Sequence, residues 1–107
     1  MKHTPIVDEI IWLEVQKVKR MLRLDEDVVC VTDKKHWKKL FPKSKPEKVY
    51  ATAMTQTGYF FLDINECETL RDLQFAIAHE LIHLRYPNAK HPKVYKLSYE
   101  YVRGRYD

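Results

Sequence analysis

Residues 69–85, TLRDLQFAIAHELIHLR, decide how this chain of 107 residues folds. Thr69 precedes an apolar segment and Asp72 follows three residues later, which is a capping-box pattern with the shorter acid. Apolar residues then recur at helical spacing, and neither glycine nor proline interrupts them before Pro87. The stretch therefore predicts a helix from Leu70 to about Tyr86, with one apolar face turned toward a core.

The same helix contains the pattern H-E-x-x-H, from His79 to His83. Four residues along a helix rise by about 6 Å and complete slightly more than one turn, so the two imidazoles lie one above the other. This arrangement lets both of them bind one Zn²⁺ ion. Glu80 lies about 100° around the helix axis, where its carboxylate can take a proton from zinc-bound water. We therefore expect His79 and His83 as metal ligands and Glu80 as the catalytic residue.

A catalytic zinc ion needs a third protein ligand and one open coordination position. His91 follows His83 by eight residues, just beyond Pro87, where the chain can turn back toward the metal. Glu100 follows His83 by seventeen residues and is the alternative. We expect His91 as the third ligand, and Glu100 remains open.

The remaining segments supply a small sheet and further helices. In chain order, we expect a helix over residues 4–24, a strand over 28–31, a lysine-rich connection over 34–48, hairpin strands over 49–54 and 59–64, and a C-terminal helix or extended tail over 92–107. Thr4 and Pro5 suit the start of the first helix, and Gly58 suits the hairpin turn. The order predicts an α+β fold, with a small, mostly antiparallel sheet packed against the N-terminal helix and the H-E-x-x-H helix.

Length and composition restrict the class of protein. A chain of 107 residues allows one domain, residues 1–107, and the apolar runs are too short for a membrane span. The N-terminal residues lack the features of a secretory signal, so we expect a cytoplasmic location and free thiols at Cys30 and Cys67. The net charge of +4 permits an acidic partner without requiring one, and the oligomeric state, monomer or dimer, is left open.

Residues 59–64 (YFFLDI), 79–84 (HELIHL) and the later Pro-Asn…His together resemble the minigluzincins. These are small metallopeptidases similar to the catalytic cores of HtpX-like and CaaX-processing membrane peptidases. The resemblance implies a zinc endopeptidase that cleaves peptides or unfolded proteins, with His79 and His83 as ligands and Glu80 as general base and acid. Most members of the wider gluzincin group use a glutamate as third ligand, which keeps Glu100 open. The resemblance also implies latency, in which a C-terminal segment, here residues 92–107, covers the cleft as in a zymogen.

For the mechanism, we expect residues 59–64 to form the edge strand to which a substrate peptide adds. Tyr86 and Tyr95 are the candidates for stabilising the oxyanion.

Two other functions compete with a peptidase. One is a nucleic-acid-associated metalloprotein similar to the SprT-like peptidases, because lysines alternate with aromatic residues between the first strand and the hairpin. The residues of this basic segment are Lys34, Lys35, His36, Trp37, Lys38, Lys39, Phe41, Lys43, Lys45 and Lys48. The other is a non-catalytic zinc module, which four protein ligands would identify.

Overall fold

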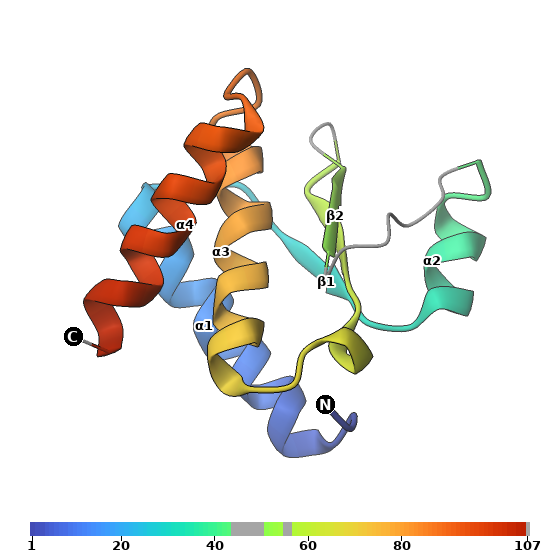
Figure 1. The fold of residues 1–107 in the computed structure, drawn as a ribbon. Coiled ribbons are helices and arrows are strands. Elements are labelled where there is room, and N and C mark those ends of the chain that lie inside the picture. The colour runs from blue at the N-terminus through green and yellow to red at the C-terminus, as the bar shows by residue number, and fades with distance from the viewer. Residues whose placement is uncertain (44–50, 55–56, 107) are drawn as a thin grey trace.

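The computed structural model describes residues 1–43, 51–54 and 57–106 (Figure 1). The elements are α1 (Pro5–Leu22), β1 (Val29–Val31), α2 (Lys34–Leu40), β2 (Ala51–Met54), β3 (Tyr59–Leu62), a 3-10 turn (Ile64–Glu66), α3 (Leu70–Arg85) and α4 (His91–Tyr106). The predicted α+β class is confirmed. No helix in the described part of the chain is both long and apolar enough to cross a membrane.

The first helix, α1, begins as its sequence predicts. The Thr4 side chain accepts a hydrogen bond from the Val7 amide, and Pro5 occupies the first helical position, where its missing N–H is not needed. The helix ends two residues earlier than expected, because Arg23 adopts the left-handed conformation, with φ of 53°. The buried face of α1 packs against the sheet and α3.

The sheet has the strand order β1-β3-β2. β2 and β3 pair antiparallel, as a hairpin requires, but β1 pairs parallel to β3, with Val29 opposite Tyr59. The expectation of a mostly antiparallel sheet is therefore wrong. No tight turn joins β1 to β3: the chain passes through α2 and β2 first, and such a crossover brings β3 back in the same direction as β1.

The position of β3 corrects a second expectation. Residues 59–62 form the central strand, so this segment is not the edge to which a peptide adds. The strand also ends at Leu62, because Asp63 accepts a hydrogen bond from the Asn65 amide and starts the 3-10 turn. The two edges of the described sheet are β1 and β2.

The lysine-rich connection is also corrected, because residues 34–40 form the helix α2. Asp33 caps this helix by accepting a hydrogen bond from the Lys35 amide at 2.9 Å. The Trp37 side chain is 0% exposed and packs edge-on against Phe61 of β3, at a centroid distance of 5.8 Å. Burial of this one large ring holds α2 on one face of the sheet. Lys45 and Lys48 lie outside the described residues.

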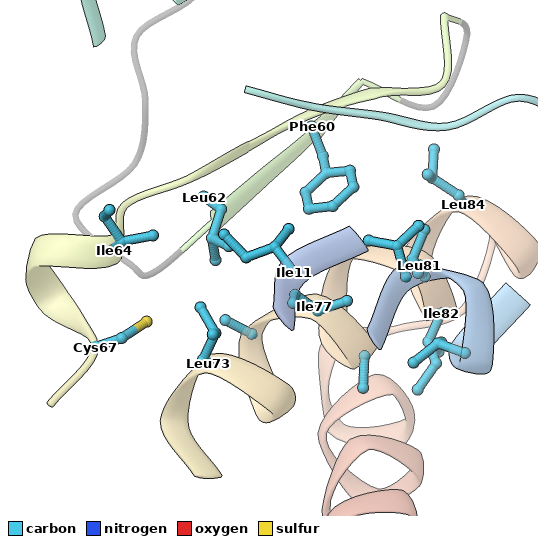
Figure 2. Packing of buried hydrophobic residues seen from close by; sticks show 14 of the residues in the cluster. Ile11, Phe60, Leu62, Ile64, Cys67, Leu73, Ile77, Leu81, Ile82 and Leu84 are labelled. Carbon is cyan, nitrogen blue, oxygen red and sulfur yellow. The ribbon is translucent and has the colours of Figure 1, made fainter. Parts of the chain in front are cut away.

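The main core lies on the other face of the sheet, where Phe60 and Leu62 alternate with Phe61 along β3. Figure 2 shows these two side chains meeting Ile11 of α1 and several side chains of α3. The α3 side chains with 0% exposure are Leu73, Ile77, Ala78, Leu81 and Ile82. α3 is thus the helix around which α1, the sheet and α4 are arranged.

The predicted C-terminal helix is present as α4, which runs beside α3 (Figure 1). Val94 and Ser98 are fully buried and Val102 is 2% exposed. The hydroxyl of Tyr101 donates a hydrogen bond of 2.7 Å to the buried Glu14 carboxylate of α1. One face of α4 is therefore part of the core, and the other face is exposed to solvent.

Candidate metal centre

The start of α3 is set by the expected capping box. The Thr69 hydroxyl accepts from the Asp72 amide, and the Asp72 carboxylate accepts from the Thr69 amide, both at 3.1 Å. From there the helix continues without interruption for 16 residues. Because the backbone is regular over the motif, Nε2 of His79 and Nε2 of His83 lie 3.2 Å apart.

The turn after α3 brings the third histidine to the same place. The Ala89 amide donates to the Tyr86 carbonyl at 3.0 Å, which reverses the chain so that α4 begins at His91. The His91 ring centroid lies 4.9 Å from that of His83 and 5.9 Å from that of His79. Each of the three histidines offers one nitrogen, and these nitrogens all lie within 4.8 Å of one another.

The three nitrogens suit a zinc ion. Ligand atoms at about 2.0–2.1 Å from a tetrahedral zinc are separated by about 3.3–3.4 Å, close to the 3.2 Å between His79 and His83. No fourth histidine, cysteine or acidic residue joins the group among the residues that the structure describes. Three imidazoles with one position left open are the donor set of a catalytic zinc site, whereas structural sites have four protein ligands.

Glu80 lies beside the histidines, as its place in the motif predicts. Its side chain is 3% exposed, and its Oε1 lies 3.9 Å from Nε2 of His79. The carboxylate is therefore next to the metal-binding nitrogens and largely screened from bulk water. This is the position that a proton acceptor for a reacting water molecule requires.

The surroundings of His79 favour its neutral form. Burial, and then the neighbouring His83 and His91, lower the pKa of His79 from 6.5 to about 4. A neutral imidazole keeps the lone pair that a metal needs, so this ligand is available at neutral pH. Its Nδ1 is buried and has no hydrogen-bond partner within the described residues, although most zinc-bound histidines donate from the second nitrogen to a carbonyl or carboxylate.

The structure separates the alternatives that the sequence left open. Glu100 is not in the histidine group: it lines a different pocket, between α1, α3 and α4, together with Tyr86 and Tyr101. Tyr95, by contrast, lies against the histidines, with its ring centroid 4.8 Å from that of His79. Of the two tyrosine candidates, Tyr95 is the one beside the candidate metal centre.

The basic segment is only partly available for nucleic acid. Lys35, Lys38 and Lys39 are exposed on α2, but Trp37 is fully buried and so cannot stack on a base. Nζ of Lys34 lies 3.4 Å from Oδ2 of Asp63, so the carboxylate offsets part of the lysine's positive charge. Burial therefore removes Trp37 from that hypothesis, whereas Phe41 is half-buried and the lysines remain a charged surface.

One residue beside the centre, Phe75, was not singled out from the sequence, and Tyr99 was considered only as one of the tail tyrosines that could fill a groove. The ring of Phe75, one turn before His79, lies 4.7 Å from the ring of Tyr99 and 6.0 Å from the ring of Tyr95. The available signal was spacing, because Phe75 precedes His79 by four residues and Tyr99 follows Tyr95 by four.

Comparisons with known proteins assign the chain to no family. No protein-family model, curated protein or solved structure matches it.

Proposed function

We propose that this protein is a zinc-dependent endopeptidase. The observation that supports this best is the group of three histidine nitrogens within 4.8 Å, next to the buried carboxylate of Glu80. His79, His83 and His91 would hold the ion, and the open position would face the substrate. This assignment agrees with the resemblance to the minigluzincins, and it takes His91 rather than Glu100 as third ligand.

A bound zinc ion supplies Lewis acidity, which polarises the peptide carbonyl and makes water at the site more acidic. The protein's own residues transfer the proton and stabilise the developing negative charge. Glu80 accepts the proton of the attacking water at its carboxylate and then gives it to the amine that leaves. Tyr95, whose ring lies against that of His79, is the candidate phenol for the oxygen that becomes negatively charged.

The substrate would be a peptide or an unfolded protein, bound along β2. β2 is an edge strand and contacts α3, so a peptide paired to it would pass over the helix that bears His79. Added strands gain main-chain hydrogen bonds without a demand on sequence. This replaces β3, which is the central strand, as the docking edge.

Three further features of the proposal are not needed for the chemistry. Membership of the minigluzincin family, a cytoplasmic location and latency remain predictions. Latency would have to involve the exposed face of α4, because the opposite face supplies Val94 and Ser98 to the core. Loss of residues 92–107 would therefore destabilise the domain rather than simply open the site.

The test is the substitution Glu80→Gln, which keeps the size of the side chain and removes the proton acceptor. We expect the variant to bind one zinc ion per chain, as the wild type does, and to lose cleavage of unfolded casein by about 10²–10⁴-fold. Glu9→Gln, on the exposed face of α1, is the matched control and keeps full activity. Undiminished cleavage by Glu80→Gln refutes the proposal, whereas a zinc-loaded wild type that cleaves nothing is the result that latency predicts.

A further inference from the structure

The row of rings beside the candidate metal centre continues beyond the histidines. α3 and α4 run antiparallel, and each presents a ring at every fourth residue along the shared face. The facing pairs and their centroid distances are His83 with His91 at 4.9 Å, His79 with Tyr95 at 4.8 Å and Phe75 with Tyr99 at 4.7 Å. The first pair consists of metal ligands, and the last is purely aromatic.

The aromatic end of this row is open to solvent. Tyr99 is 62% exposed, Tyr95 is 39% exposed, and Phe75 is half-buried between them. We call Phe75, Tyr95 and Tyr99 the aromatic shelf. Three adjoining rings that remain this accessible can take up an apolar side chain by stacking and by burying its surface.

We propose that the aromatic shelf determines specificity, by receiving a large apolar or aromatic side chain of the substrate close to the scissile bond. The inference rests on the proposed peptidase function. One helical turn, about 6 Å, separates His79 from Phe75. An extended peptide advances about 3.3 Å per residue, so a side chain one or two residues from the scissile bond reaches the shelf.

The net charge of α4 works against a cationic side chain on the shelf, although aromatic faces also attract cations. Among the described side chains of α4, Lys93, Lys96 and Arg103 are basic and Glu100 is acidic. The helix that supplies Tyr95 and Tyr99 is thus positive on balance. A lysine in the substrate would be repelled, whereas phenylalanine or leucine would gain the full contact.

The experiment measures peptide binding and cleavage separately. Zinc-loaded Glu80→Gln protein is titrated with unstructured peptides of an Ala-Gly-Ser background, in which Phe, Leu, Asp or Lys occupies each position in turn. We expect the Phe and Leu peptides to bind on the order of tenfold more tightly than the Ala, Asp and Lys peptides at one position. The wild type should show the same order in kcat/KM.

Variants assign this preference to the shelf. Tyr99→Ala should abolish it, and Tyr99→Phe, which keeps the ring, should preserve it. Trp12→Ala is the matched control, since Trp12 is also 62% exposed but lies in a groove between α1 and β1. We expect this control to keep the preference, and circular dichroism checks that each variant is folded.

Three results overturn the inference: equal binding of all peptides, tightest binding of the Lys peptide, or an equal effect of Tyr99→Ala and Trp12→Ala. Each of them leaves Glu80-dependent cleavage intact, so the proposed function survives. Conversely, cleavage that persists in Glu80→Gln refutes the proposed function, while the binding preference of the shelf is still measured.

Discussion

Zinc should stabilise the folded protein through His91, because among the described residues it is the one on α4 that joins the two proposed ligands on α3. A ligand that binds only the folded state stabilises it by RT ln(1 + [L]/Kd), which is about 2.7 kcal/mol at a free zinc concentration of 100 Kd. Unfolding entropy of about 2.1 cal/mol/K per residue gives about 0.22 kcal/mol/K for 107 residues. We therefore expect zinc to raise the Tm of the wild type by about 12 °C.

The substitution His91→Ala removes one of the three proposed ligands. Loss of even a residue that only supports a ligand lowers metal affinity by about 10–100-fold, so we take 100-fold as the minimum here. At the same free zinc concentration the stabilisation then falls to about 0.4 kcal/mol, or about 2 °C in Tm. Differential scanning calorimetry in a zinc buffer, with and without chelator, measures both values.

Two controls make this result specific. Glu100→Ala removes the alternative ligand and should keep the full shift, because Glu100 lines a different pocket. His36→Ala removes an exposed histidine of α2 and should also keep it. A full shift in His91→Ala, or its loss in Glu100→Ala, would refute the reasoning from the histidine group.

The remaining predictions concern stability and reactivity. Tyr101→Phe removes the hydroxyl that donates to the buried Glu14 carboxylate, and it should lower the free energy of unfolding by about 1–3 kcal/mol in urea titrations; an unchanged value would show that this hydrogen bond contributes nothing. The metal-free protein should lose stability as the pH falls from about 6.5 to about 4, because the unfolded state takes up a proton at His79 in this range and the folded state does not. The loss is at most about 3 kcal/mol, and His79→Gln should lack this part of the pH dependence. Partial burial, and then the neighbouring Asp8 carboxylate, raise the pKa of the half-buried Cys30 thiol to about 12, so iodoacetamide at pH 8 should modify it slowly until the protein is unfolded; rapid modification of the folded protein would contradict the raised pKa.

The local features of the fold were predictable from the sequence. The caps at Thr4 and Thr69, the turn at Gly58 and the closeness of the His79 and His83 nitrogens all depend on residues within a few positions of one another. Backbone geometry over such short distances leaves few alternatives, so spacing alone is informative. The same holds for the location of Glu80 beside the two histidines.

The tertiary structure decided what depends on contacts between distant segments. The direction of β1 and the central place of β3 follow from which strands pair, and short apolar strands do not specify that. The lysines of α2 suggested an exposed connection, but burial of the single side chain of Trp37 against Phe61 gives this segment its place.

The sequence by itself determined that two imidazoles and a carboxylate share one helix, because four residues nearly match one helical turn. It left two candidates for the third ligand, since both His91 and Glu100 follow a turn whose direction the residues do not fix. Only the packing of α4 against α3, through Val94 and Ser98, decided that His91 meets the other histidines and Glu100 does not. The angle at which one helix packs on another results from many distant side chains acting together, and no local spacing encodes it.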